Sequence, residues 1–269
     1  LPGDGYGPSI IDAAERTVTM ATGDVEIVRG DIGFAAYERT GELLPSDTAD
    51  LVRECGTAIC GPVKDYRDDV GKTFNPLESL KVGLDLYAVK RSFRTLSDDL
   101  GVPGLDITLW ASNMTLGSDI VESRDIDGIT ISKYIRSSSY SRMMARALTD
   151  LELSGKGSVV CVTQDTLFPD SSNMFSETFD SLFDPSVFDT DHRNVQYWAS
   201  KFVRDPKEFD YVVCADLYSN VAAGIMAGLT GGNRLSPIAY VGEGCTLILP
   251  GLYKTFEDVP KGYANPTSA

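Results

Sequence analysis

The segment DPKEFDYVVCADLYSNVAAGIMAGL, residues 205–229, joins a short apolar run to a stretch rich in small residues. Residues 209–215 are almost continuously apolar, as expected of a strand covered on both faces. Residues 220–229 predict a buried helix. A buried strand that leads directly into a helix is typical of α/β proteins. No acidic residue lies between Tyr218 and Arg234, so residues 220–229 offer no carboxylate to a metal ion.

The same alternation continues on both sides of this segment. Apolar runs predict strands at residues 25–28, 57–63, 86–89, 106–111 and 157–163, and a period of two predicts a half-buried strand at 129–135. Helical spacing predicts helices at 9–20, 35–39, 45–55, 77–84 and 138–152, with Ser9 and Ser46 as N-caps. We therefore expect an α/β fold with a mostly parallel central sheet.

Composition excludes several classes of function. The 269 residues carry a formal net charge of −15, which disfavours binding to nucleic acid or to an anionic membrane surface. Any membrane contact is therefore expected only through partners. His192 is the only histidine, so histidine-based zinc sites and most Ser/His triads are excluded. The five cysteines are scattered through apolar runs and are expected to be reduced thiols.

Six segments stand in order along the chain: GDGYGPSI (3–10), TGELLP (40–45), CGPV (60–63), LYAVKRSFR (86–94), DPKEFDYVV (205–213) and KGYANPT (261–267). One such segment alone would be a weak signal, but six at matching spacing are specific. Together they resemble the isocitrate/isopropylmalate dehydrogenase family, and most closely its mitochondrial NAD-dependent isocitrate dehydrogenase branch.

The resemblance implies a two-lobe fold and a dimer. Residues 1–90 and 226–269 would form a discontinuous large lobe, and residues 91–225 a small lobe that carries dimerisation elements. The family has a strand before the opening glycines and a helical segment after the last match. The large lobe is therefore expected to lack part of its cover at both ends.

The resemblance also implies hydride transfer from a 2-hydroxy acid followed by decarboxylation, which needs a divalent metal held by carboxylates. The family supplies three Asp. The matching positions here are Gln196, Asn220 and Gly224, so no metal site is expected. A slip of one position in the alignment could hide one missing carboxylate, but it could not hide all three.

The remaining reactive positions are also changed. The family's Lys and Tyr acid/base pair corresponds to Gln164 and Asp119, and an amide cannot shuttle a proton near neutral pH. A substrate-binding Arg becomes Ser112. The His of the cofactor loop becomes Leu252, and only Asn265 of that region is retained. We therefore expect neither catalysis nor a bound cofactor.

Three cations remain where the family binds substrate carboxylates: Arg91, Arg94 and Lys81, the last in place of an Arg. They form either a remnant anion site or ordinary solvated and paired residues. An exchange of Arg for Lys is not conservative at a bidentate site, which counts against binding.

Three functions follow from these observations. The first is a catalytically inactive structural or accessory subunit, bound to other protein subunits in a dimer or larger assembly in the mitochondrial matrix, as the resemblance to that branch implies. The second is a regulatory subunit of a heteromeric NAD-dependent isocitrate dehydrogenase, with Arg91 and Arg94 on an effector. The third, least favoured, is an active dehydrogenase.

Overall fold

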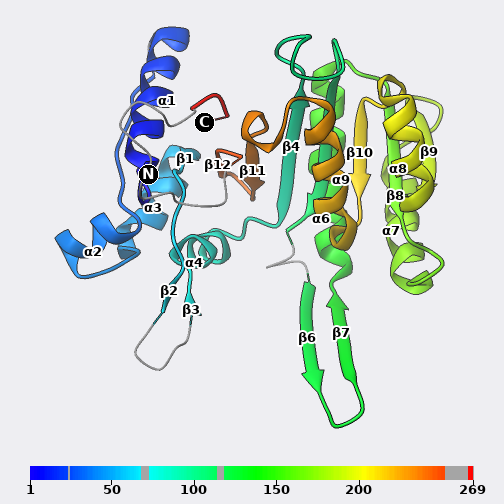
Figure 1. The fold of residues 1–269 in the computed structure, drawn as a ribbon, viewed down its shortest axis with the longest axis horizontal. Helices are drawn as coiled ribbons and strands as arrows, with labels where there is room; N and C mark the ends of the chain where they lie inside the picture. Colours follow the sequence, from blue (N-terminus) through cyan, green and yellow to red (C-terminus); the bar gives the residue numbers. More distant parts are fainter. Residues whose placement is uncertain (24, 68–72, 114–117, 252–265, 269) are drawn as a thin grey trace. The chain divides into compact units, whose positions relative to one another are not determined.

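The computed structural model describes residues 1–23, 25–67, 73–113, 118–251 and 266–268 (Figure 1). The chain forms two compact units. The first contains Leu1–Leu86 and Asn233–Ala269, and the second Tyr87–Gly232. The sequence placed these divisions at 90/91 and 225/226. No helix among the described residues is long and apolar enough to cross a lipid bilayer.

The first unit combines helices with a small sheet. Strand β12 lies between β1, to which it is parallel, and β11, to which it is antiparallel. The elements are α1 (Gly7–Thr22), α2 (Phe34–Thr40), α3 (Ser46–Cys55), β1 (Thr57–Ile59), β2 (Tyr66–Arg67), β3 (Thr73–Phe74), α4 (Pro76–Gly83), η2 (Asn233–Leu235), β11 (Ile238–Val241) and β12 (Thr246–Leu249).

A buried carboxylate holds the glycine-rich opening of the chain in place. Asp4 accepts hydrogen bonds from the backbone N–H groups of Phe34 (2.7 Å) and Lys64 (2.8 Å) and from the Tyr66 hydroxyl (2.8 Å). Gly33 has φ 90°, and a Cβ there would overlap the Asp4 carboxylate. Only glycine suits this position, because it meets both demands. Burial, followed by the hydrogen bond to Asp4, raises the pKa of Tyr66.

The second unit contains a five-stranded sheet in the order β4-β5-β10-β8-β9. Strand β4 is antiparallel to β5, and the other three pairings are parallel. The elements are β4 (Ala88–Arg94), β5 (Asp106–Ser112), β6 (Ser118–Arg124), β7 (Ile129–Ile135), α6 (Ser137–Ser154), β8 (Ser158–Thr163), α7 (Pro169–Leu182), β9 (Asp189–Asn194), α8 (Val195–Arg204), η1 (Pro206–Glu208), β10 (Tyr211–Cys214) and α9 (Asp216–Leu229). The predicted α/β class with a mostly parallel sheet is confirmed.

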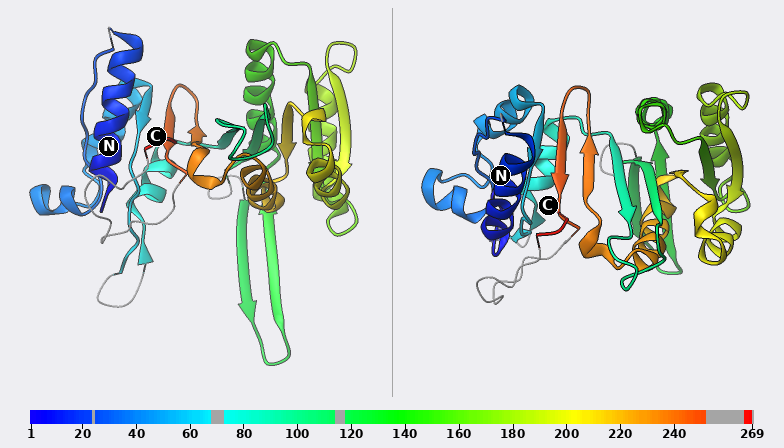
Figure 2. Two further views of the ribbon diagram at one scale, coloured as in Figure 1. Left: turned by 45° about the horizontal axis from the view of Figure 1, so that its top comes forward. Right: turned by 90° about the horizontal axis from the view of Figure 1, so that it is seen from above.

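Helices cover both faces of this sheet (Figure 2). α6 and α7 pack on one face, where Tyr140 meets Phe175 edge to face. α8 and α9 pack on the other, where Trp198 stacks on Phe202 with ring centroids 5.1 Å apart. Both tryptophans are core residues, since Trp110 is also buried. Strands covered on both faces explain the continuous apolar runs of β8 and β10.

Several predicted element ends were wrong for local reasons. α1 begins two residues before Ser9, because Pro8 suits the first helical turn. Its N-cap is therefore Tyr6, and the N-cap of α3 is Pro45 rather than Ser46. Residues 25–28 are not a strand in the structure. Residues 86–89 are only partly one, since β4 begins at Ala88 and continues to Arg94.

Strands β6 and β7 form an antiparallel hairpin apart from the main sheet (Figure 1). The side chain of Asp125 accepts hydrogen bonds from the N–H groups of Asp127 and Gly128 and closes the turn. β7 has the predicted bounds, but the prediction that it is half buried was wrong within this chain. Ile129 and Ile131 are 57% and 70% exposed.

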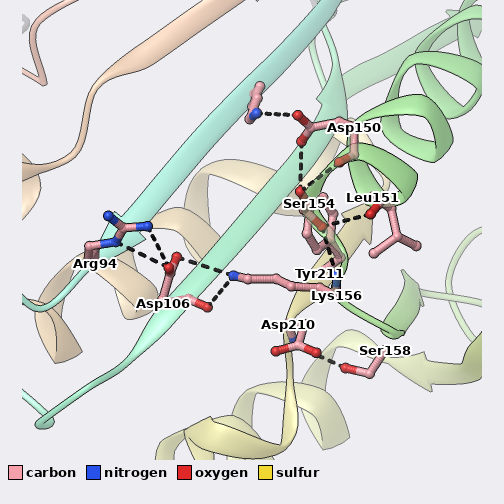
Figure 3. Close-up of polar contacts among 10 residues, drawn as sticks. Arg94, Asp106, Asp150, Leu151, Ser154, Lys156, Ser158, Asp210 and Tyr211 are labelled. Atoms are coloured by element: carbon pink, nitrogen blue, oxygen red, sulfur yellow. Dashed lines mark hydrogen bonds and ion pairs between the residues drawn. The ribbon is translucent and has the colours of Figure 1, made fainter.

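Two carboxylates bind the elements together at the edge of the sheet where parallel strands begin (Figure 3). Asp150 of α6 accepts from Lys90 (2.5 Å), from Trp110 Nε1 (3.1 Å) and from the Tyr211 hydroxyl (3.0 Å). Asp106 Oδ2 accepts from Arg94 Nη2 at 2.7 Å. This edge of the sheet is thus occupied by internal ion pairs.

Lys156 is a second cation beside the carboxylate of Asp106. Its Nζ lies 3.2 Å from the carboxylate of Asp106 and donates to the Asp106 carbonyl at 2.8 Å. Burial opposes ionisation of Asp106, but hydrogen bonds from Arg94 and the charge of Lys156 outweigh it. The pKa of Asp106 is therefore lowered from 3.8.

This lowered pKa predicts a weak acid dependence of stability. The contribution of Asp106 to the free energy of unfolding is present above about pH 4, the ordinary pKa of an aspartate. It is lost as the pH falls through the lower pKa of the folded state. Replacing Arg94 by Met should remove part of it, roughly 0.5 kcal/mol, because the pair is partly exposed. Urea unfolding between pH 2.5 and 6 measures this. Equal pH profiles for Arg94→Met and the control Arg204→Met would exclude the effect.

Candidate functional site

The edge of the second unit where parallel strands end is the expected position of a site, because open α/β sheets bind ligands there. β5 ends at Ser112, β8 leads into Gln164, and β9 ends at Asn194. β10 leads into α9, which carries Asn220. The fold therefore brings Ser112, Gln164 and Asn220, three positions that the sequence singled out, to ends of neighbouring strands or to the helix that follows one.

An amide cluster joins β8 to β9 at this edge. Asn194 Nδ2 donates to Gln164 Oε1 at 2.5 Å and to Asp165 Oδ1 at 2.8 Å. Gln164 is buried, with 4% of its surface exposed. The hydrogen bond from Asn194 lowers the pKa of the exposed Asp165 carboxyl. The position predicted to correspond to the family's lysine thus holds a neutral, hydrogen-bonded amide.

Asn220 and Gly224 lie on one exposed face of α9, one turn apart. Carboxylates at these two positions would point in the same direction and could share a metal ion. This chain instead has the amide of Asn220 and, at Gly224, no side chain. Among the described residues, a Cβ on Gly224 or Gly228 would meet nothing within 4 Å, so close packing within that part of the chain does not require glycine at either position.

The third predicted metal position, Gln196, also lacks charge. Gln196 is exposed at the start of α8, and its backbone N–H donates to Asn194 Oδ1 at 3.1 Å, an N-cap hydrogen bond. In the part of the chain that the structure describes, no three His, Cys, Asp or Glu side chains are grouped to hold a metal. Hard divalent cations need carboxylate oxygens, so the residues at these three positions do not fit such an ion.

Ser112, predicted to stand at the position of the family's substrate-binding Arg, is buried at the end of β5, with 2% of its surface exposed. Its hydroxyl makes no hydrogen bond within the described part of the chain. A serine at this position brings no positive charge for a substrate carboxylate.

The other predicted positions lie elsewhere. Asp119 is in β6 of the hairpin, opposite Tyr134 of β7, and does not belong to the five-stranded sheet. Leu252 and Asn265 lie outside the described residues.

The two arginines of β4 do not converge. They are three residues apart on a strand, so their side chains leave opposite faces. Arg91 is 5% exposed, and its guanidinium carbon lies 5.1 Å from the Phe93 ring centroid. Arg94 faces solvent and binds Asp106, at the opposite edge from the amide cluster. A joint anion site for this pair stays a prediction that the geometry does not favour.

Lys81 of α4 belongs to the first unit and is 3% exposed. Its Nζ lies 2.7 Å from Glu78 and 3.8 Å from the Tyr240 ring centroid. Burial works to lower the pKa of Lys81, but Tyr240 and Glu78 outweigh it and raise the pKa. The ammonium group is therefore already engaged within its own unit.

Sequence reasoning missed Asn194 and Asp165. The signal for Asn194 was an Asn directly before the helical run VQYW, which is a common N-cap. What the sequence did not show is that the same side chain also reaches across to Gln164. That contact depends on β8 and β9 being neighbours in the sheet.

The fold of the second unit and the position of its candidate site are those of an open α/β protein that binds ligands where its parallel strands end. A model of the isocitrate/isopropylmalate dehydrogenase family matches residues 1–269. The chain belongs to the isocitrate/isopropylmalate dehydrogenase family.

Relatives of known activity agree with this assignment. The chain is 26% identical over 279 aligned positions to an isocitrate/homoisocitrate dehydrogenase of Thermus thermophilus, covering all of this chain and 81% of that protein. It is 24% identical to a 3-isopropylmalate dehydrogenase of Saccharolobus solfataricus, of which it covers 79%. A crystal structure of isocitrate dehydrogenase from Methylococcus capsulatus superposes with a TM-score of 0.81 at 25% identity, covering 99% of this chain and 80% of that one.

Proposed function

We propose that this chain is a catalytically inactive member of its family that acts as a structural or accessory subunit of a protein assembly. The observation that carries the proposal is the neutral character of four predicted site positions at the edge where parallel strands end. Gln164, Gln196 and Asn220 present amides, and Gly224 presents no side chain, where metal-dependent chemistry needs carboxylates and an acid/base group.

The physical argument concerns charge. Were the chain active, its substrates would be isocitrate, homoisocitrate or 3-isopropylmalate, the 2-hydroxy acids named for its relatives. Such anions are held by cations and by a bound divalent ion, which also polarises the carbonyl group. In this chain Arg94 and Lys81 are ion-paired, and the amide of Gln164 cannot take or give a proton.

The hairpin of β6 and β7 supports the accessory role. An isolated two-stranded hairpin is marginally stable in water, and this one exposes Ile129 and Ile131 on one face. Covering such a face with another protein chain would bury apolar surface and add strands or side chains against it. A regulatory subunit that binds an effector through Arg91 and Arg94 remains the second candidate. The pairing of Arg94 with Asp106 counts against it.

The hairpin gives a direct test of the accessory role. Ile129→Glu with Ile131→Glu places charges on the apolar face of β7. We expect this variant to lose partners that co-purify with the unaltered chain and to sediment as a smaller particle. The matched control is Thr130→Glu with Ser132→Glu, on the opposite face of the same strand, which should keep the assembly. Equal assembly in both variants would argue against the hairpin as a contact surface.

A further inference from the structure

Helix α7 of the second unit presents a row of acidic side chains to solvent (Figure 1). Phe175 and Phe179 on its inner face are buried. Its outer face carries exposed polar residues at steps of three or four, so that they lie above one another, and a further carboxylate follows just past the helix end. These residues are Asp170, Asn173, Glu177, Asp180 and Asp184. The helix has 14 residues and is therefore about 21 Å long.

Cations within the described part of the chain do not neutralise this row. Residues 157–192 contain no Lys or Arg, but they contain seven carboxylates: Asp165, Asp170, Glu177, Asp180, Asp184, Asp189 and Asp191. Among the described residues, the only charged or titratable partner of the row is His192, whose Nε2 lies 2.7 Å from Asp180. Helix α3 is different, because its exposed Asp50 pairs with Arg53. The acidity of α7 thus lacks an internal counterpart.

The position of these charges along α7 opposes helix formation. Asp170 lies in the first turn, where the helix dipole favours an anion. Asp180 lies in the last turn and Asp184 just beyond it, where the dipole favours cations, and the last turn has no basic residue. Glu177 and Asp180 are three residues apart, a spacing at which like charges repel. The hydrogen bond from the Ser186 N–H lowers the pKa of Asp184, so this carboxylate stays ionised.

Exposed apolar side chains stand at both ends of the row. Leu167 and Phe168, directly before the helix, are 65% and 48% exposed. Val187 is 67% exposed, and its N–H donates to the Asp184 carbonyl at 3.0 Å, which fixes it beside the last carboxylate. Single exposed apolar residues are ordinary, but these flank a helix face of uniform charge. Partner helices are commonly recognised through apolar anchors on an amphipathic face.

We propose that the exposed face of α7 is a docking surface for a basic helix of another protein. Lys or Arg residues at steps of three or four would face Glu177, Asp180 and Asp184, and apolar residues would contact Phe168 and Val187. A second copy of α7 would oppose carboxylate to carboxylate and is disfavoured. The proposal rests on the accessory role for the existence of a partner, but it concerns a surface separate from the hairpin of β6 and β7.

A synthetic helical peptide tests this contact. It has about 18 residues, with lysines on one face at steps of three or four and a leucine at each end. Fluorescence anisotropy compares its affinity for the unaltered chain and for Glu177→Gln with Asp180→Asn and Asp184→Asn. The amides can still bond to His192 and to the N–H of Ser186. We expect affinity to fall about tenfold, because each exposed ion pair contributes little by itself.

Glu26→Gln with Glu38→Gln and Glu42→Gln is the matched control, since it removes the same charge from exposed positions of the first unit. It should change the affinity less than about twofold, because salt screens distant charges. A peptide of equal composition with its lysines spread around the helix should bind the unaltered chain more weakly. Equal weakening in both variants, or equal affinity of both peptides, would overturn the proposal in favour of attraction by net charge alone.

Thermal unfolding gives a readout that does not depend on the peptide. The α7 variant should unfold at or above the temperature of the control, because it loses like-charge repulsion and an unfavourable interaction with the helix dipole. A lower unfolding temperature would contradict the claim that these charges oppose the helix. Peptide binding through α7 by a chain with which no protein co-purifies would support this surface and count against the accessory role, so the two proposals fail separately.

Discussion

Replacing Asp150 by alanine is expected to lower the free energy of unfolding by about 3 kcal/mol. This carboxylate links α6 to three strands, because it accepts from Lys90 of β4, Trp110 of β5 and Tyr211 of β10. Trp110 and Tyr211 are each 3% exposed. Without Asp150, the indole N–H of Trp110 loses its acceptor inside the protein, and leaving a buried donor unsatisfied costs about 1–3 kcal/mol.

The ion pair with Lys90 adds less than the buried hydrogen bonds, because both partners are partly exposed and solvent screens them. Asp150→Asn keeps an acceptor for Trp110 and should cost less than Asp150→Ala. Glu152→Ala, an exposed position on the same helix, is the control and should change stability by less than about 0.5 kcal/mol. Urea unfolding at pH 7 measures all three. Equal losses for Asp150→Ala and Glu152→Ala would contradict the proposed link.

Asp4→Ala is expected to have a similar effect in the first unit, a loss of about 3 kcal/mol. The substitution removes the acceptor for the N–H groups of Phe34 and Lys64 and for the hydroxyl of Tyr66. These three groups come from two segments far from Asp4 in sequence, so the loss should also loosen the glycine-rich opening of the chain. Urea unfolding measures the loss of stability, and hydrogen exchange at the amides of Phe34 and Lys64 measures the loosening.

Two matched variants separate the hydrogen bonds of Asp4 from its charge. Asp4→Asn keeps one acceptor oxygen and should fall between the unaltered chain and Asp4→Ala. Asp50→Ala removes an exposed carboxylate that pairs with the partly exposed Arg53 and should cost less than about 0.5 kcal/mol. If Asp4→Ala were no more damaging than Asp50→Ala, Asp4 would not anchor the opening segment.

Much of the fold could be predicted from local pattern. The apolar runs at β8 and β10 and the two-residue period of β7 predicted strands where the structure has them. Element ends were harder to predict because they depend on the surroundings. Residues 25–28 have the apolar pattern of a strand but line a groove. Ile129 is exposed because, among the described strands, β7 pairs with β6 alone.

The candidate site could be located but not built from sequence. The register placed Gln164 after β8, and the structure places that residue at the expected edge of the sheet. The hydrogen bond from Asn194 and the ion pair of Arg94 with Asp106 were missed, because each joins strands that are neighbours only in the folded sheet. The sequence also indicated the two cations of β4, and their spacing of three residues along a strand already implied opposite faces, which the prediction of a joint anion site did not take into account.

The central claim is that this chain has lost the chemistry of its family, and turnover tests it most directly. The purified chain, with its partners where they co-purify, is incubated with isocitrate, homoisocitrate or 3-isopropylmalate, NAD and Mg²⁺, beside a relative of known activity. We predict NADH formation more than about 10⁴-fold below the relative, unchanged by removing the metal with a chelator. Saturable, Mg²⁺-dependent turnover by the isolated chain within about 100-fold of the relative would contradict the account.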